Sequence, residues 1–189
     1  MMNNRSHVLI VISGPSGCGK TTIAHALLER HPETMFSVSA TTRHKRPNEV
    51  YGKDYFFLTR DEFEQKIERN ELAEWEQIYG DYYGSLISEI EKSAIAGVPM
   101  LFDVDVKGAL SIKKKYTDRA VLIFIKPPSL ECLIERLRKR NTETPETFAR
   151  RMNRAAMELD LAKEFDHVIV NDDLTNAIAT ADAIAFPKK

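Results

Sequence analysis

The chain has 189 residues, enough for one substantial domain but short for two independent ones. Its 43% hydrophobic and 29% charged residues are typical of globular proteins and exclude collagen-like, low-complexity and disordered classes. The net charge of −1 excludes a globally basic surface, so neither nucleic acid nor an anionic membrane is expected as a partner. No apolar run approaches the ~18 residues of a membrane-spanning helix, so a cytosolic protein is expected.

Four short apolar runs predict the strands of a parallel sheet: VLIVI (8–12), PMLFDV (99–104), AVLIFI (120–125) and HVIVN (167–171). Apolar residues at successive positions are typical of strands that helices cover on both faces. The fold class is therefore predicted to be α/β.

Helix-end signals lie between these runs. Thr59 and Glu62 have the spacing of a capping box, and Thr144 followed by Pro145 predicts another helix start. Gly97 is expected to end a helix that begins after Ser85.

Two segments depart from this alternation. Residues 37–86 contain short polar and aromatic strands separated by glycine-containing turns, which indicates a small inserted lobe. Residues 136–154 contain seven basic and two acidic side chains, a net charge of +5 within a nearly neutral protein. Such a local concentration of charge indicates a site for an anionic ligand.

The segment GPSGCGKT, residues 14–21, matches the P-loop pattern GxxxxGK[ST] between a predicted strand and a predicted helix. Its glycines let successive backbone N–H groups surround phosphate oxygens. Lys20 is expected to reach the β- and γ-phosphates, and the Thr21 hydroxyl is expected to bind Mg²⁺.

Asp103 ends the second apolar run, where P-loop enzymes carry the acidic group that orients Mg²⁺. Asp105 follows two residues later, and the strand period predicts that both carboxylates point to the same side. Ligands of open α/β sheets bind at this carboxyl end of the strands.

The inserted lobe combines arginine and tyrosine side chains. Arg43 and Arg46 lie in a polar loop, and Tyr55 and Tyr83 stand beside glycine-containing turns. Guanidinium forks and phenol groups suit a dianionic phosphate, although such a set is also compatible with a solvated charge cluster.

These motifs together resemble the guanylate kinases. The resemblance runs from about Val8 to Leu174 through the P-loop, SVSATTRHKRP, GKDYFF, EWEQIYGDYYGS, LFDVDVKG, RLRKRNTET and VIVNDDL. It implies one domain, residues 1–189, with a P-loop core around a five-stranded parallel sheet (1–36, 87–135 and 155–189), a GMP-binding lobe (37–86) and a helical lid (136–154).

The resemblance also implies roles for individual residues. ATP is expected to be bound by Gly14, Pro15, Ser16, Gly17, Cys18, Gly19, Lys20, Thr21, Thr22, Arg136 and Asn171, with Asn171 bordering the adenine. GMP is expected to be bound by Ser39, Arg43, Arg46, Tyr55, Glu74, Tyr83, Ser85 and Asp105. Catalysis is assigned to Lys20, Arg43, Arg140 and Arg151, and the metal to Thr21 and Asp103.

Two positions depart from the family pattern. The usual GRGTE of the lid is replaced by KRNTE (139–143), which removes both glycines, and Cys18 stands where Thr or Ser is usual. A helix N-terminus and Lys20 close to Cys18 would lower its pKa and activate the thiol. The alternative is a small, buried and inert thiol.

The function expected from these observations is phosphorylation of GMP, and of dGMP, by MgATP through in-line transfer. The acceptor is already anionic because its second pKa is ~6, so no general base is required. Glu74 can pair with the adjacent N1–H and 2-amino donors of guanine, whereas adenine lacks them. Two alternatives are a non-catalytic guanylate-kinase-like interaction module and a related kinase with another phosphate acceptor. Lys20, Thr21 and Asp103 disfavour the first alternative, and Glu74, Ser39 and Ser85 disfavour the second. Whether the chain is a monomer or a homo-oligomer stays open.

Overall fold

The computed structural model describes residues 9–139 and 145–187. Its central sheet has five parallel strands in the order β2-β7-β1-β8-β9. They are β1 (Leu9–Ser13), β2 (Met35–Phe36), β7 (Met100–Asp103), β8 (Ala120–Lys126) and β9 (His167–Val170). The predicted α/β class and its four apolar strands are confirmed, while the two-residue edge strand β2 is too short to produce a pattern in the sequence.

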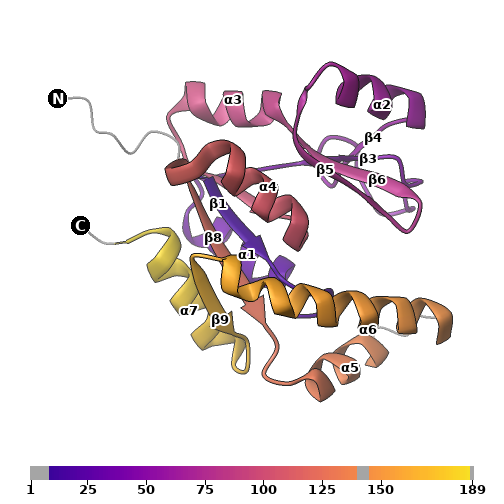
Figure 1. Cartoon of the computed structure of the whole chain (residues 1–189). Coiled ribbons are helices and arrows are strands. Elements are labelled where there is room, and N and C mark those ends of the chain that lie inside the picture. The colour runs from indigo at the N-terminus through magenta and orange to yellow at the C-terminus, as the bar shows by residue number, and fades with distance from the viewer. Residues whose placement is uncertain (1–8, 140–144, 188–189) are drawn as a thin grey trace.

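Helices cover both faces of this sheet (Figure 1). Leu9 and Val11 of β1 face a core shared with α3 (Ile87–Ala96) and α4 (Val106–Tyr116). Ile10 and Ile12 face the opposite core, shared with α1 (Lys20–Arg30) and α7 (Leu174–Ala185). Burial on both faces explains why the strand sequences are continuously apolar.

The predicted capping signals fix two of the helix ends. Thr59 and Glu62 form a complete capping box at the start of α2 (Arg60–Glu68). Gly97, at φ 68°, occupies the left-handed region just after α3, as expected for a glycine that ends a helix.

Residues 39–86 build a second, smaller sheet in the order β4-β3-β6-β5. Its strands are β3 (Ser39–Thr41), β4 (Phe56–Phe57), β5 (Leu72–Ile78) and β6 (Asp81–Leu86). Helix α2 packs against it around the buried Phe63, and this core is separate from those of the central sheet. In Figure 1 the small sheet and α2 lie together at one side of the central sheet.

The described parts of the basic segment belong to helices α5 (Leu130–Lys139) and α6 (Pro145–Asp160). Leu133 and Leu137 of α5 pack with Ala155 of α6, and the two helices lie alongside each other (Figure 1). Pro145 is the first residue of α6, as predicted, whereas Thr144 lies outside the described residues. Short 3₁₀ turns follow α4 (Thr117–Arg119) and α6 (Leu161–Glu164).

Candidate active site

The P-loop connects β1 to α1 in the predicted position. Gly14, Gly17 and Gly19 all have positive φ, at 140°, 91° and 99°. A Cβ atom on Gly14 would lie 2.2 Å from the carbonyl oxygen of Ile125, so this position requires glycine for space as well as for backbone conformation. The tight loop therefore rests directly on the neighbouring strand β8.

Lys20 begins α1 and folds back over the loop. Its Nζ donates hydrogen bonds to the carbonyl oxygens of Gly14, at 2.7 Å, and Pro15, at 3.1 Å. These bonds hold the ammonium group at the mouth of the loop, in a hollow of about 170 Å³ that Ser16, Gly17, Gly19, Thr21 and Thr22 also line. A phosphate group placed there would meet a fixed positive charge.

Thr21 and Asp103 meet although 82 positions separate them in the sequence. The Thr21 hydroxyl donates to Asp103 Oδ2 at 2.5 Å. Asp103 is the last residue of β7, and β7 pairs with β1 directly before the P-loop. The parallel register thus brings the Thr21 hydroxyl and the Asp103 carboxylate to the same edge of the sheet.

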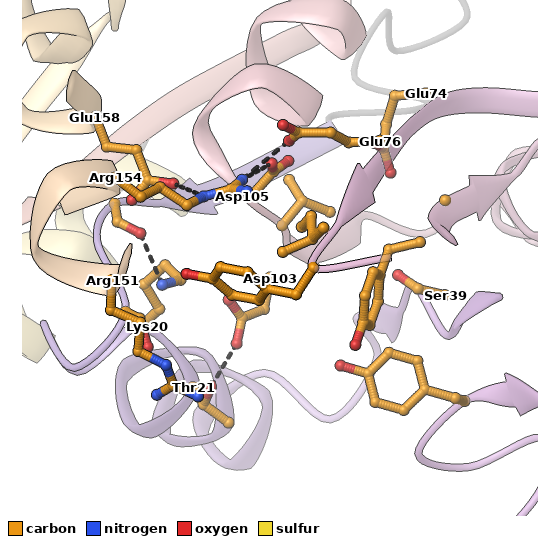
Figure 2. Close-up of a pocket in the computed structure, with 18 residues that line it drawn as sticks. Lys20, Thr21, Ser39, Glu74, Glu76, Asp103, Asp105, Arg151, Arg154 and Glu158 are labelled. Carbon is orange, nitrogen blue, oxygen red and sulfur yellow. Dashed lines mark hydrogen bonds and ion pairs between the residues drawn. The ribbon is translucent and has the colours of Figure 1, made fainter. Parts of the chain in front are cut away.

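A cavity of about 330 Å³ opens between this edge, the small sheet and α6 (Figure 2). It brings together eleven of the residues predicted from the sequence: Gly14, Ser16, Lys20, Thr21, Ser39, Tyr55, Glu74, Tyr83, Asp103, Asp105 and Arg151. The phosphate-binding loop lies at one end and the carboxylates of the small sheet lie at the other. One continuous cavity therefore links the two predicted substrate sites.

Three predicted guanine-binding residues lie in one row across the small sheet. Ser39 of β3 pairs in register with Ser85 of β6, and Ser85 pairs with Glu74 of β5. The Ser85 hydroxyl donates to Glu74 Oε1 at 2.6 Å. Glu74 is only 7% exposed, and this burial raises its pKa to about 7 despite the Ser85 hydrogen bonds, which lower it. The site therefore contains a carboxyl group with one oxygen already oriented.

Asp105 lies close to Glu74 but on a different element. Its Oδ1 accepts a hydrogen bond from the backbone N–H of Gly108 at 2.9 Å, so Asp105 is the N-cap of α4. The expectation that Asp103 and Asp105 share one side of a strand is therefore wrong in its geometry, because β7 ends at Asp103. Both carboxylates still line the cavity.

The two predicted phosphate tyrosines face each other across the small sheet. The ring centroids of Tyr55 and Tyr83 are 6.2 Å apart in an edge-on arrangement, and the Arg43 guanidinium carbon lies 5.4 Å from the Tyr55 ring centre. Burial raises the pKa of Tyr55, which keeps its phenol protonated and able to donate a hydrogen bond.

Arg43 itself is paired with a residue that the sequence analysis did not select. It forms an ion pair with Glu49 at 2.6 Å, and Glu49 also accepts the backbone N–H of Arg46 at 2.8 Å. The Glu49 hydrogen bond raises the pKa of Arg43, and the Arg43 hydrogen bond lowers the pKa of Glu49. Arg46 is exposed, and neither arginine belongs to the lining of the 330 Å³ cavity.

The predicted ATP residues of the C-terminal half occupy different positions. Arg151 of α6 lines the cavity, while the Arg136 guanidinium of α5 donates to the Asn171 carbonyl oxygen at 3.0 Å. Asn171 is 4% exposed, and its side-chain amide donates to the carbonyl oxygen of Cys18 at 2.8 Å. The Asn171 side chain thus stabilises the P-loop by a hydrogen bond to its backbone. Arg140 lies outside the described residues.

The prediction of an activated Cys18 thiol is wrong in direction. Cys18 is fully buried, and desolvation raises its pKa despite the lowering effect of Lys20. The P-loop turns this side chain into the apolar core shared by α1 and α7 rather than toward the cavity. The inert, buried alternative fits the structure.

Three further charged residues line the cavity and were not selected as site residues: Glu76, Arg154 and Glu158. The alternation of side chains along β5 could have identified Glu76, because a residue two positions after Glu74 lies on the same face of the strand. Arg154 was counted only as one charge of the basic segment. Its pairing with Glu158 has the i,i+4 spacing of a helix-face ion pair, but its pairings with Glu76 and Asp105 join distant segments and left no pattern in the sequence.

Within residues 9–139 and 145–187, no helix has the length and apolar character needed to cross a membrane. The same residues contain no cluster of three or more His, Cys, Asp or Glu side chains that could hold a metal ion by themselves.

Comparison with known proteins agrees with the geometry. The guanylate kinase family model matches residues 6–185. The chain is 50% identical over 183 residues to a guanylate kinase of Chlorobaculum tepidum, covering 95% of this chain and 94% of that protein. It is 48% identical over 178 residues to one of Gloeobacter violaceus, covering 94% and 86%. The crystal structure of guanylate kinase from Anaplasma phagocytophilum superposes with a TM-score of 0.78 at 33% identity, covering 95% of this chain and 85% of that one. The chain belongs to the guanylate kinase family.

Proposed function

We propose that the protein transfers the γ-phosphoryl group of ATP to GMP, with ADP and GDP as products. The observation that carries this proposal is the cavity whose two ends hold Lys20 of the P-loop and the buried Glu74, which accepts a hydrogen bond from Ser85. Membership of the guanylate kinase family supports the same reaction. Residues 37–86 would form the GMP-binding lobe, and residues 136–154 the lid.

The guanine base would bind at the carboxylate end. Glu74 Oε2, the oxygen that Ser85 does not occupy, would accept a guanine N–H, and Ser39 and Asp105 lie within the same cavity. An adenine ring would place an acceptor against this carboxylate and leave buried polar groups unpaired. Sites of this kind discriminate between substrates by ~10⁴ to 10⁵.

The phosphate groups would meet between the small sheet and the P-loop. Tyr55, Tyr83, Arg43 and Arg46 would hold the GMP phosphate, while Lys20 and the P-loop amides would hold the ATP phosphates. Arg151, together with Arg136 and Arg140, would neutralise charge that develops during transfer. The reaction then depends on placing two polyanions in line and excluding water, and the acceptor oxygen is already ionised.

The Thr21–Asp103 pair fits a magnesium ion. Both donors are hard oxygens at the cavity edge, and Mg²⁺ is commonly held by one or two protein oxygens with water and substrate phosphates as its other ligands. A bound ion would neutralise phosphate charge and orient the β- and γ-phosphates. Thr21 and Asp103 are the residues that would hold it.

A coupled ADP-release assay with GMP, dGMP, AMP, UMP and no acceptor tests the proposal. Turnover with GMP and dGMP at rates far above those with AMP and UMP is expected. Activity only with AMP would overturn the base-recognition argument. A folded protein without activity toward any acceptor would favour the alternative of a non-catalytic interaction module.

A further inference from the structure

Arg154 is the point at which three parts of the chain meet. It extends from α6, and its Nη2 donates to Asp105 Oδ2 at 2.6 Å and to Glu76 Oε2 at 3.0 Å. Its Nε donates to Glu158 Oε1 at 2.7 Å. Asp105 belongs to the cap of α4, Glu76 belongs to β5 of the small sheet, and Glu158 lies one turn further along α6.

Arg154 and its carboxylate partners are partly buried, which distinguishes this cluster from an exposed surface ion pair. The side chains of Arg154, Asp105, Glu76 and Glu158 are 25%, 17%, 16% and 11% exposed. Lys107 approaches Glu76 at 3.4 Å but is itself 65% exposed. Arg154 is therefore the shielded cation among three carboxylates, and such pairs gain more from charge than exposed ones.

Both oxygens of Asp105 are fixed by these contacts. Oδ1 is held by the Gly108 N–H at 2.9 Å and Oδ2 by Arg154. A carboxylate oxygen has two acceptor sites, so Oδ2 can take a second donor from the cavity in a direction that Arg154 sets. Glu74 Oε2 and Asp105 Oδ1 both lie within 2.7 Å of the position that a Cβ on Gly108 would occupy, so the two carboxylates border the same space.

Arg151 and Arg154 also connect the two ends of the cavity. They lie three positions apart on α6, a spacing that puts side chains on one helix face, and both line the cavity. Figure 2 shows Arg151 near Lys20 and Arg154 directed toward Asp105 and Glu76. The same helix therefore carries one arginine at the phosphate end and one at the base end.

We propose that Arg154 is a positioning residue for guanine recognition, which orients Asp105 toward the 2-amino group of the base and ties α6 to the base-binding strand through Glu76. This inference rests on the proposed function. Guanine has two N–H bonds on its 2-amino group, so Glu74 can accept one and Asp105 the other. Arg154 acts through Asp105 and does not touch the reacting phosphates.

A comparison of GMP with IMP tests this role, because hypoxanthine keeps N1–H and lacks the 2-amino group. Arg154→Ala is expected to lower kcat/KM for GMP about tenfold, mainly through KM, while kcat/KM for IMP changes less than about twofold. Arg154→Lys keeps the charge but loses the guanidinium fork, so it should restore part of the preference for GMP. Asn153→Ala, an exposed neighbour on α6, is the matched control and should leave both substrates unchanged.

A double-mutant cycle separates positioning from a structural role. In an Asp105→Asn background, Arg154→Ala should cause no further loss of the GMP preference over IMP. Equal losses for GMP and IMP, or an additive effect in the Asp105→Asn background, would overturn the proposal. If Arg154→Ala does not fold, the same comparison is made with Arg154→Lys. A ratio of kcat/KM for GMP to kcat/KM for IMP equal to that of wild type would then overturn the proposal. Wild-type protein that does not phosphorylate GMP would instead refute the proposed function.

Discussion

Arg43 and Glu49 form a two-pronged ion pair, in which Nη2 donates to Oε1 at 2.6 Å and Nη1 donates to Oε2 at 3.1 Å. Nη1 also donates to the His44 carbonyl oxygen at 2.8 Å. A guanidinium has five N–H donors, so Arg43 keeps donors for a phosphate while Glu49 holds it in place. The pair thus orders a predicted substrate-binding arginine before substrate binds.

Glu49→Gln should weaken this arrangement, because the amide has one acceptor oxygen and no charge. We expect KM for GMP to rise about tenfold, which corresponds to about 1.4 kcal/mol, with KM for ATP unchanged within twofold. Steady-state kinetics with each substrate varied in turn measures both constants. Glu64→Gln breaks the exposed Arg60–Glu64 pair of the same lobe and is the matched control. A lower KM for GMP in Glu49→Gln would mean that Glu49 competes with the phosphate.

Lys20→Ala should abolish turnover and leave the fold intact. The side chain bonds only to two loop carbonyls within the described residues and contributes no packing to the hydrophobic cores. Loss of the charge that faces the transferred phosphoryl group should lower kcat by ~10³ or more. Thermal unfolding monitored by circular dichroism checks the fold, with Lys114→Ala, an exposed lysine of α4, as control. A kcat within tenfold of wild type would show that Lys20 does not serve the reaction.

The raised pKa of Glu74 predicts that the affinity for GMP depends on pH. Burial raises its pKa to about 7, whereas a guanine N–H requires the ionised carboxylate. GMP binding should therefore weaken as pH falls below about 7, and at pH 7 binding should release about half a proton from this group. Calorimetry in two buffers with different ionisation enthalpies measures the released protons.

The GMP phosphate can also release a proton on binding. Glu74→Gln distinguishes that proton from the one that Glu74 releases. The variant should release fewer protons than wild type and should lower kcat/KM for GMP by ~10² or more, because an acceptor is replaced by a donor that faces a donor. Equal proton release in the two proteins would contradict the raised pKa. Unchanged GMP kinetics would remove Glu74 as the guanine-reading residue.

The same pKa shift affects stability with a definite sign. Below pH 4.5, the ordinary pKa of a glutamate side chain, Glu74 is protonated in both the folded and the unfolded chain. Between 4.5 and about 7 the folded chain retains a proton that the unfolded chain loses, so this group lowers the free energy of unfolding as pH rises through that window. Urea titrations of wild type and Glu74→Gln at pH 5 and pH 8 should show a larger loss of stability in wild type.

Cys18 should react more slowly than Cys132. Cys18 is fully buried with a raised pKa, whereas Cys132 on α5 is partly exposed. Iodoacetamide at pH 7 followed by peptide mapping should label Cys132 first, and labelling of Cys132 should leave activity largely intact. Faster labelling of Cys18 that nucleotide suppresses would instead support an activated thiol.

The sequence predicted the parts of this protein that local physical rules determine. Continuous apolar runs predicted β1, β7, β8 and β9, and Thr59 with Glu62 predicted the start of α2. The P-loop glycines predicted a backbone conformation that only glycine adopts easily. In each case a short segment carries the complete signal.

The parts that the residues alone did not predict depend on contacts between distant segments. Arg154 meets Glu76, 78 positions away, and Asp105, 49 positions away, and no local pattern records either pairing. For Cys18, the hypothesis of an activated thiol fails and the buried, inert alternative fits, because its neighbours in the sequence suggest a positive environment while its neighbours in space are apolar. Asp105 was placed on a strand because the chain turns into α4 earlier than the strand period suggests.

The hydrogen bond from Asn171 to the carbonyl oxygen of Cys18 spans 153 positions and has a consequence for synthesis of the chain. During translation the P-loop emerges early, but the strand that leads into its supporting amide is the last strand of the central sheet. Contacts of such long range form late, since the intervening chain must first be ordered. A nascent chain would therefore gain tight nucleotide binding only after β9 and Asn171 have left the ribosome, and ATP could then stabilise only chains that already contain this strand.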